Sequence, residues 1–375
     1  MDDTAYFIGI ISGTSMDGID CVAIKLQEQK LELVASHSSR YPDDLRRQLF
    51  NICANPNVSL LHLGQLNVAV GKAFGNAINI LLCQHHLSAE MITAIGSHGQ
   101  TIYHSPETSD AFSLQIGDPN TIASITGITT IADFRQRDIS VGGQGAPLAP
   151  LFHQYFFYND NCTRCILNIG GISNITVISD TPTSTPVGFD TGPGNALMDL
   201  WISRCLQEPF DAGGAWAASG NVHSALLDRF LSDEYFQRKS PKSTGRELFN
   251  QSWLDRCLND FEPINQADIQ RTLLELTARS VADALNLTVL LKANSSIELL
   301  VCGGGVHNTT LMSRLQQLLP AIEVKSTLSC GMPPEWIEAS TFAWLASKTI
   351  NKEKIDTGIL TGARQPIILG GVYYS

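Results

Sequence analysis

Asp190 is the residue whose surroundings best fit acid–base chemistry. It lies in the segment Gly188–Asn195 (Gly-Phe-Asp-Thr-Gly-Pro-Gly-Asn), which leads into a helix-like run over 196–201. The pattern places a carboxylate at a strand end, inside a glycine-lined turn that precedes a helix. A carboxylate in that position can take a proton from an attacking hydroxyl or water. The same spacing also suits an aspartate that caps the helix or stabilises the turn, so both interpretations stay open.

Three glycine clusters have the composition of a nucleotide site. They occupy 12–18, 170–174 and 303–305, and each follows an apolar, strand-like run. Successive backbone N–H groups in such turns can approach phosphate oxygens because no side chains block them. A single cluster is more typical of a tight hairpin turn, whereas three together favour a nucleotide site. The P-loop motif and the Gly-x-Gly-x-x-Gly motif are both missing from the sequence, which argues against a P-loop NTPase and a simple Rossmann domain.

The first cluster also carries polar side chains. Asp17 could hold Mg²⁺ through water beside the β- and γ-phosphates, or it could stabilise the turn. Thr14 and Ser15 offer hydroxyl and N–H groups to phosphate oxygens, or they cap the turn. Asp20 begins the following strand, which favours a structural role.

Polar residues elsewhere could contact a sugar-like ligand. His98 and Gln100 follow an apolar run, so they could hydrogen-bond a ligand or form a satisfied buried cluster. Arg135 or Arg137 could clamp a ligand carboxylate. The alternative is that these arginines pair with Asp133 and Asp138. Glu338 lies on a predicted helix that is otherwise apolar and aromatic, so its carboxylate is either exposed or functional.

The elements that must position these residues alternate between strands and helices, which predicts an α/β protein. The first strand-like runs form an antiparallel meander around the first glycine cluster, and a second hairpin surrounds the second cluster. Asp268 is the expected N-cap of a helix that reaches Leu285. The two hairpins predict two similar halves, with the second starting near residue 150. The strand-like runs are 6–11, 19–26, 31–36, 165–169, 175–178 and 297–302, and further helices are expected over 310–319 and 336–350.

Composition narrows the class of protein. The chain has 375 residues, with 25 basic and 36 acidic side chains and a formal net charge of −11. Such a surface repels phosphate backbones, so neither nucleic acid nor an anionic membrane is an expected partner. The hydrophobic share of 43% excludes disorder. Nine cysteines, an odd and scattered set, fit reduced thiols. Because no run approaches transmembrane length, a soluble cytoplasmic protein is expected.

The motifs together resemble the anhydro-N-acetylmuramic acid kinases, and the likeness runs from about residue 6 to the end. Each glycine motif is weak by itself, but the combination is specific. The segments that carry the resemblance are Ser12–Asp20, Gly96–Thr101, Gln115–Pro119, Ala132–Arg135, Gly142–Pro147, Asn168–Gly171, Gly188–Asn195, Gly213–Gly220, Pro241–Glu247 and Val301–Gly305.

The resemblance implies a fold and a reaction. The family belongs to the sugar kinase, Hsp70 and actin superfamily, with two ribonuclease-H-like domains and an interdomain active-site cleft. Here the domains would be 1–150 and 151–375, and the C-terminal end could return to the first domain. The implied reaction uses ATP and Mg²⁺ to convert 1,6-anhydro-N-acetylmuramic acid to N-acetylmuramic acid 6-phosphate and ADP in peptidoglycan recycling. Water opens the anhydro bridge at the anomeric carbon, while the freed 6-oxygen attacks the γ-phosphate.

The resemblance also implies roles for individual residues. Asp190 would be the general base that activates the water, with Glu338 as a second catalytic residue near the sugar. His98, Gln100, Arg135 and Gly192 would line the sugar, with Arg135 on the lactyl carboxylate. Asp17 would hold the metal through water. The implied ATP-binding residues are Gly13, Thr14, Ser15, Met16, Asp17, Gly18, Ile19, Asp20, Gly170, Gly171, Gly303, Gly304, Gly305 and Asn308.

One departure from the family pattern is visible, and two rival functions stay open. Asp211-Ala-Gly-Gly-Ala-Trp216 stands where many relatives have Asp-Arg-Asp-Gly-Ala-Trp, so substrate affinity or domain closure could differ. The first rival is a kinase for an ordinary hexose. The second is an ATP-driven chaperone or filament protein, although no residues are left over for a peptide-binding domain. Many enzymes of this kind are homodimers, but nothing in the sequence locates an interface.

Overall fold

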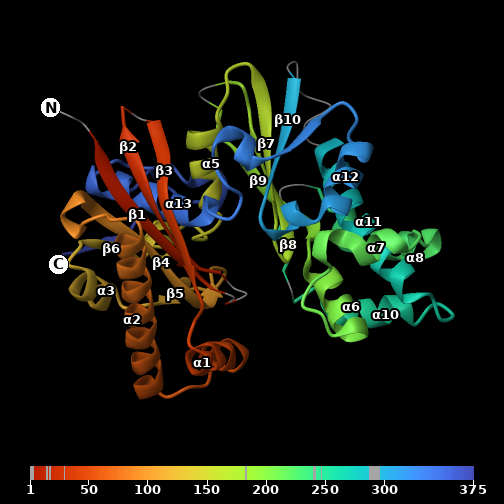
Figure 1. Ribbon diagram of the computed structural model, residues 1–375, viewed down its shortest axis with the longest axis horizontal. Helices are drawn as coiled ribbons and strands as arrows, with labels where there is room; N and C mark the ends of the chain where they lie inside the picture. Colours follow the sequence, from red (N-terminus) through yellow and green to blue (C-terminus); the bar gives the residue numbers. More distant parts are fainter. Residues whose placement is uncertain are drawn as a thin grey trace. The chain divides into compact units, whose positions relative to one another are not determined.

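A computed structural model describes residues 4–13, 16, 18–28, 30–181, 184–239, 242–245, 247–286 and 296–375 (Figure 1). The chain divides into two compact units. Unit 1 contains the residues up to Phe152 together with the segment Trp336–Ser375, and unit 2 is His153–Glu335. The chain passes from unit 1 to unit 2 within helix α5 (Ala149–Phe157) and returns at residue 336.

Unit 1 is built on a mixed sheet. Its strand order is β12-β6-β4-β1-β2-β3, with β5 paired to the outer part of β4. β1, β2 and β3 are antiparallel, which confirms the predicted meander, while β4 runs parallel to both β1 and β6. The strands are β1 (Ala5–Ser12), β2 (Ile19–Gln27), β3 (Lys30–Ser39), β4 (Ile92–Ser105), β5 (Phe112–Ile116), β6 (Thr130–Ala132) and β12 (Gly371–Tyr373).

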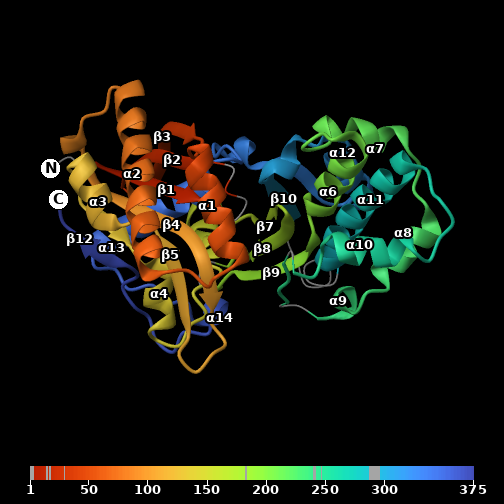
Figure 2. The ribbon, with the colours of Figure 1, turned by 90° about the horizontal axis from the view of Figure 1, so that it is seen from below.

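Helices cover both faces of this sheet (Figure 2). Because successive side chains of a strand point to opposite faces, the neighbours of β1 identify the two layers. Ile8 and Ile10 join the buried cluster that contains Phe74 of α2, whereas Gly9 faces Ala339 of α13. The helices of unit 1 are α1 (Asp43–Ala54), α2 (Leu60–Gln84), α3 (Pro119–Thr126), α4 (Phe134–Ile139), α13 (Ile337–Ile350) and α14 (Gly358–Thr361), with a 3₁₀ turn at Ala89–Met91.

Helix α13 approaches the sheet unusually closely. Gly9 of β1 and Gly96 of β4 are partners in the parallel pair. A Cβ atom on Gly9 would lie 1.9 Å from the carbonyl oxygen of Ala339, and one on Gly96 would lie 2.0 Å from that of Phe342. Any larger residue would therefore collide with the helix backbone, so the two glycines allow the C-terminal segment to pack directly on the central strands.

Helix α2 corrects the expectation that no run approaches transmembrane length. Its length and composition would suffice to cross a membrane, with a mean hydropathy of 1.4 over its most apolar 18-residue stretch. Half of that stretch is buried inside the structure. Leu66, Val70, Phe74, Ile78 and Leu81 belong to the core of unit 1, which accounts for the apolar composition of the helix.

Unit 2 repeats the same sheet plan. Its strand order is β11-β10-β7-β8-β9, in which β7, β8 and β9 are antiparallel and β10 runs parallel to both β7 and β11. Counted from the first strand of each unit, both sheets follow the ribonuclease-H-like order, which confirms the predicted fold class. The strands are β7 (Cys162–Ile169), β8 (Ile172–Ile178), β9 (Val187–Pro193), β10 (Ser296–Cys302) and β11 (Glu323–Ser326).

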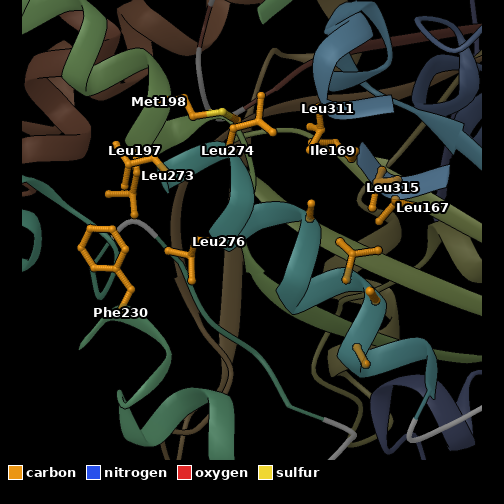
Figure 3. Close-up of a cluster of buried hydrophobic side chains, with 14 of the residues drawn as sticks. Leu167, Ile169, Leu197, Met198, Phe230, Leu273, Leu274, Leu276, Leu311 and Leu315 are labelled. Carbon is orange, nitrogen blue, oxygen red and sulfur yellow. The ribbon is translucent and has the colours of Figure 1, made fainter. Parts of the chain in front are cut away.

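The core of unit 2 surrounds helix α11 (Figure 3). Leu273, Leu274 and Leu276 of α11 pack in one buried cluster with Leu167 of β7 and Leu311 of α12. Asn265 caps α11 by accepting a hydrogen bond from the Ala267 N–H, so the predicted Asp268 cap is wrong. The helices are α6 (Ala196–Leu206), α7 (Ala215–Ser219), α8 (Ser224–Leu231), α9 (Glu234–Gln237), α10 (Gln251–Leu258), α11 (Gln266–Leu285) and α12 (Thr309–Leu318), with 3₁₀ turns at Ala212–Gly214, Gly304–His307 and Thr327–Cys330.

Candidate active site

Asp190 is fixed through its backbone on strand β9. Its N–H donates to the carbonyl of Lys242 at 2.9 Å. The hydroxyl of Tyr235 donates to the carbonyl of Asp190 at 2.8 Å. The strand is paired with β8 on its other side, opposite Asn174. These contacts leave the carboxylate as the part of the residue that is available for chemistry.

The two carboxylate oxygens of Asp190 differ. Oδ2 accepts the N–H of Thr244 at 2.9 Å, while Oδ1 has no hydrogen-bond partner among the described residues. Burial raises the pKa of Asp190 to about 6, opposed by the Thr244 N–H and assisted by the negative charge of Glu247. A carboxylate with one fixed oxygen, one open oxygen and a raised pKa is suited to accept a proton near neutral pH.

The segment that holds Asp190 was not assigned a role from the sequence. The Lys242 ammonium donates to the carbonyl of Tyr235 at 3.0 Å and lies 4.4 Å from the centre of its ring. Together with the Thr244 N–H, these contacts place 242–244 against β9. The motif over 241–247 was the available signal, but a motif alone does not reveal that its backbone binds Asp190. Gly192, also on β9, is buried and pairs with Ser173 of β8.

The glycine turn between β7 and β8 is anchored to the start of α6. The carbonyl of Gly170 accepts the N–H of Asn195 at 2.8 Å, and that of Gly171 accepts the N–H of Gly194 at 2.9 Å. In a trans peptide the C=O and the following N–H point in opposite directions. The N–H groups of Gly171 and Ile172 therefore point away from α6, as a phosphate-binding turn requires.

The third glycine cluster lies beside this turn. Gly303 has a φ of 74°, and a Cβ atom there would lie 2.3 Å from Oδ1 of Asn168 and 2.8 Å from the carbonyl oxygen of Ile169. Gly305 packs against the same isoleucine, and Asn195 donates to its carbonyl at 3.1 Å. The structure thus brings Gly170, Gly171 and the 303–305 cluster together at the end of β7.

Asn308 has a defined structural contact. Its side-chain oxygen accepts the N–H of Leu311 at 3.0 Å and so caps α12. Between α11 and α12 lies a polar hollow of about 260 Å³ that the sequence did not indicate. Its lining residues are Arg271, Thr309, Thr310, Ser313, Arg314 and Gln317.

The loop that departs from the family pattern lies beside α12. Both oxygens of Asp211 accept backbone N–H groups at the start of α7, from Trp216 and Ala217, each at 2.9 Å. The carbonyl of Gly213 accepts the hydroxyls of Thr309 and Thr310. Asp211 thus holds α7, while Gly213, one of the two departing positions, contacts Thr309 and Thr310 of the polar hollow.

In unit 1, the loop after β1 is described in part. The carbonyl of Gly13 accepts the N–H of Met16 at 3.1 Å, and Met16 is buried. Gly18 precedes β2, and Ile19 and Asp20 are its first residues, with Asp20 opposite Ile11 in the hairpin. Thr14, Ser15 and Asp17 lie outside the described residues, so their predicted roles in ATP and metal binding remain predictions.

Gln100 connects this loop to strand β4. It is fully buried, and its amide donates to the carbonyl of Gly13 at 3.3 Å and to that of Thr101 at 3.2 Å. Its side-chain oxygen accepts the hydroxyl of Tyr41 at 3.5 Å. The contacts of Gln100 therefore support the first glycine loop from inside unit 1.

The half-buried Arg135 and the buried His98 form a pair in unit 1. The Nε–H of Arg135 donates to Nε2 of His98 at 2.8 Å, and its Nη1 donates to the carbonyl of Gly145 at 2.9 Å. Since Nε2 accepts, Nδ1 carries the proton and donates to the Gly99 carbonyl at 3.0 Å. Burial and the Arg135 charge both lower the pKa of His98, so its imidazole is neutral and orients the guanidinium.

Glu338 is in the first turn of α13 and is accessible to solvent. The surrounding protein raises the pKa of its carboxyl by desolvation, the charge of Arg135 lowers it, and Asp20 raises it. Burial lowers the pKa of Arg135, which Glu338 and Asp138 counteract. Arg135 and Glu338 are thus within electrostatic reach of each other, and the structure brings His98, Arg135 and Glu338 into one polar cluster.

The described residues contain no group of three or more His, Cys, Asp or Glu side chains that could hold a metal ion. A Mg²⁺ ion coordinated mainly by nucleotide phosphates and water needs only one or two carboxylates. Asp20 begins β2 directly after the first glycine cluster, so unit 1 has a carboxylate that is compatible with such an ion.

Two ribonuclease-H-like units, each with a glycine turn after its first strand, define the class of sugar kinase and actin-like proteins. Within that class, the chain belongs to the anhydro-N-acetylmuramic acid kinase family, whose model matches residues 5–375. It is 48% identical over 372 residues to the anhydro-N-acetylmuramic acid kinase of Shewanella sediminis, covering 99% of each chain. It is 47% identical to that of Shewanella halifaxensis over 372 residues, again covering 99% of each chain.

Among solved structures, the chain is similar to an activator of 2-hydroxyisocaproyl-CoA dehydratase from Clostridium difficile with bound ADPNP. The identity is 13% and the TM-score 0.44, with 94% of this chain and 98% of that chain covered. The fold assignment rests on the sheet order of the two units and on the family match.

Proposed function

We propose that this protein is an ATP-dependent kinase that opens the 1,6-anhydro ring of 1,6-anhydro-N-acetylmuramic acid and phosphorylates O6. The products are N-acetylmuramic acid 6-phosphate and ADP, in peptidoglycan recycling and amino-sugar catabolism. Family membership supports the substrate. The observation that carries the chemistry is the carboxylate of Asp190: Oδ2 accepts the Thr244 N–H, and Oδ1 has no hydrogen-bond partner in the part of the chain that the structure describes.

In this proposal Asp190 activates the attacking water. Oδ1 takes a proton from the water as its oxygen bonds to the anomeric carbon, and the bond from that carbon to O6 breaks. The electron pair stays on O6, which attacks the γ-phosphorus, and ADP leaves. A carboxyl pKa of about 6 keeps Asp190 mainly ionised at pH 7 while making it a stronger base than an ordinary aspartate. General-base catalysis of this kind contributes about 10²- to 10⁴-fold to a rate.

The polar cluster of unit 1 recognises the sugar in this proposal. Arg135 would bind the lactyl carboxylate, since a guanidinium pairs with a carboxylate through two parallel hydrogen bonds. Its Nε and Nη1 atoms bond to His98 and Gly145, which fixes the plane of the guanidinium. Glu338 would hydrogen-bond a sugar hydroxyl or the anhydro oxygen from the first turn of α13. Gln100 would act through the Gly13 loop. Gly192 would contribute through its backbone, because Phe236 and Ser280 occupy the space that a Cβ atom there would need.

The glycine clusters would hold ATP. The N–H groups of Gly171 and Ile172 point away from α6, and the 303–305 cluster lies next to them. Gly170 and Asn308 would support this region, and the loop from Gly13 to Asp20 would bind the phosphates from unit 1. Mg²⁺, bound to the phosphates and through water to Asp17, would neutralise charge on the transferred phosphoryl group. Positioning and electrostatic stabilisation would supply the remaining rate enhancement.

We place the enzyme in the cytoplasm, where ATP is available. All nine cysteines are free thiols, which fits a reducing compartment. A homodimer is the expected assembly, and sedimentation at several protein concentrations tests it. The absence of nucleic-acid and membrane partners is expected from the net charge of −11.

Mass spectrometry in ¹⁸O-labelled water tests the reaction. With Mg-ATP and the anhydro sugar, the expected product is 6-phosphorylated, carries the label at the anomeric position and forms with one ADP each. ATP turnover without this product would still support a nucleotide site, but it would overturn the assignment of the anhydro sugar as the substrate. Phosphorylation of open hexoses at a higher kcat/KM would favour the ordinary hexose kinase instead.

A further inference from the structure

Asp138 lies near the end of α4 and is fully buried. Three groups donate to its carboxylate. The hydroxyls of Thr357 and Thr361 donate to Oδ1 at 2.5 and 2.9 Å, and the N–H of Gly145 donates to Oδ2 at 2.7 Å. A buried carboxylate is costly unless it is hydrogen-bonded in this way, which makes its arrangement well defined.

One of these bonds leads directly to the sugar cluster. Gly145, whose N–H binds Asp138, offers its carbonyl to Nη1 of Arg135 at 2.9 Å. Arg135 in turn donates to His98 at 2.8 Å. A continuous path of hydrogen bonds therefore runs from Asp138 through the backbone of Gly145 to the guanidinium.

The C-terminal segment of unit 1 secures the other side of Asp138. Besides the two threonine hydroxyls, the N–H of Gln144 donates to the carbonyl of Thr361 at 2.8 Å. The N–H of Arg364 donates to the carbonyl of Val141 at 3.0 Å. The loop 141–145 is thus held between Asp138 and the turn that contains α14.

Asp138 also acts on Arg135 through charge. The guanidinium is in a desolvated environment, where Asp138 and Glu338 are the carboxylates that stabilise its positive charge. Of these two, Glu338 is accessible to solvent and Asp138 is fully buried. A ligand carboxylate that binds Arg135 would compete with Glu338 for it, but it could not displace Asp138.

We propose that Asp138, held by Thr357 and Thr361, is a positioning residue for the sugar site: it fixes Gly145 so that the Arg135 guanidinium is presented in one orientation to a carboxylate-bearing ligand. The inference rests on the proposed function, because it assigns Arg135 to the lactyl carboxylate. Asp138 itself contacts no substrate in this scheme.

Steady-state kinetics with a panel of folded variants test the proposal. Asp138→Ala loses all three hydrogen bonds, and we expect the KM for the anhydro sugar to rise about tenfold or more. The KM for ATP should change by less than about twofold, because the contacts of Asp138 lie in the Arg135 cluster. Equal increases in both KM values, or no change in the sugar KM, would overturn the proposal.

The Asp138→Asn variant separates the effect of the hydrogen bonds of Asp138 from the effect of its negative charge. The amide oxygen can still accept the Gly145 N–H, and the amide nitrogen can donate to the hydroxyl of Thr357. We therefore expect the sugar KM to rise less than in Asp138→Ala. An increase equal to that of Asp138→Ala would contradict the geometric role.

A matched pair of threonine variants controls for stability. Thr361→Val and Thr126→Val each remove one buried hydroxyl of unit 1. Among the described residues, the hydroxyl of Thr126 bonds to the backbone of Ile122 and Ile128 and not to a side chain. We expect both to lower the melting temperature, and only Thr361→Val to raise the sugar KM. Identical sugar KM values in the two variants would refute a positioning role, and this pair also serves if Asp138→Ala does not fold.

A second readout needs no substrate. In ¹⁵N-histidine spectra of the full chain at pH 7.5, Nε2 of His98, assigned with a His98→Gln variant, should be unprotonated and hydrogen-bonded. Asp138→Ala should shift this signal as Arg135 loses its orientation, and Thr126→Val should leave it in place. An unshifted signal overturns the inference even if the wild type turns over no anhydro sugar, whereas that lack of turnover alone would overturn only the proposed function.

Discussion

The two units have the same sheet topology, but at one corresponding position the packing against the sheet differs. Gly9 of β1 and Ile166 of β7 each stand three residues before the end of their strand. Their partners on the neighbouring parallel strand are Gly96 and Leu300. In unit 1 the glycine pair lets the backbone of α13 reach the sheet. In unit 2 the same place is filled by two large, fully buried side chains.

The difference extends to the candidate catalytic groups. The close approach of α13 brings Glu338, in its first turn, within electrostatic reach of Arg135. Unit 1 therefore holds a cluster of opposite charges. In unit 2, Asp190 has a backbone N–H and a like charge near it, and no described cation lowers its pKa. One topology thus supports a cluster of opposite charges in one unit and a carboxylate with a raised pKa in the other.

Removal of the Asp190 carboxylate in unit 2 should have the largest effect on activity. Asp190→Asn keeps an oxygen for the Thr244 N–H but cannot take a proton, so kcat should fall about 10³-fold with a small change in KM. ADP release measures this, with Asp228→Asn on the exposed face of α8 as the control. Near-normal turnover of Asp190→Asn would show that the water is activated by another group.

The corresponding positions of the two sheets should respond in opposite ways to a change in side-chain size: Gly96 of unit 1 should not tolerate a larger side chain, and Ile166 of unit 2 should not tolerate a smaller one. Gly96→Ala should lower the free energy of unfolding by about 3 kcal/mol or more, because the new Cβ meets a helix carbonyl. Ile166→Ala should lower it by about 2–5 kcal/mol through the cavity that it leaves. Urea unfolding measures both, with Ile166→Val, at about 1 kcal/mol, as the conservative control. If Gly96→Ala were neutral, α13 would not lie against the strand backbone.

The recognition role of the unit 1 cluster predicts a substrate-dependent effect. Arg135→Met should raise the KM for the anhydro sugar about 30-fold, since a charge-assisted hydrogen bond contributes about 1.5–3 kcal/mol. The variant should discriminate little between this sugar and 1,6-anhydro-N-acetylglucosamine, which lacks the lactyl carboxylate. Equal KM values of the wild-type enzyme for the two sugars would contradict the role assigned to Arg135.

The smallest effects concern pH. Because burial raises the pKa of Asp190 to about 6 and the ionised form is the base, kcat should be level above that pH. Below it, kcat should fall about tenfold per pH unit as the carboxylate is protonated. Glu247→Gln removes the like charge and should move the midpoint to lower pH by a few tenths of a unit. A rate that is constant from pH 5 to 7.5 would contradict the assignment.

The sequence predicted the local elements better than the contacts between them. Both hairpins, helix α13 and an α/β protein of two similar halves followed from apolar periodicity and glycine placement, which act over a few residues, whereas the ribonuclease-H-like fold class followed from the family resemblance. The N-cap of α11 was misplaced because Asn265 and Asp268 are equally good caps in sequence, and only the backbone decides between them. The local sequence predicts Asp138 as a possible ion-pair partner of Arg135 or Arg137. Its hydrogen bonds instead reach Thr357 and Thr361 in the C-terminal segment, which no local pattern reveals.

In the candidate site, too, the sequence indicated the residues but not the contacts between them. Asp190 could be chosen from its turn, but the contact from Thr244, 54 residues away, could not be inferred from spacing. The pairing of His98 with Arg135 likewise joins residues 37 positions apart. Hydrogen bonds of this kind depend on how strands are ordered in the sheet, and that order is a property of the whole unit.

The return of the C-terminal segment to unit 1 has a consequence for synthesis. Unit 2 is continuous in the chain, so it can fold as soon as it leaves the ribosome. Unit 1 begins first but lacks α13 until the whole of unit 2 has been translated, and until then α13 cannot cover the glycine face of β1 and β4. A nascent chain that stops before residue 336 lacks α13, so this face of β1 and β4 would stay exposed, as apolar surface is in folding intermediates that aggregate or bind chaperones.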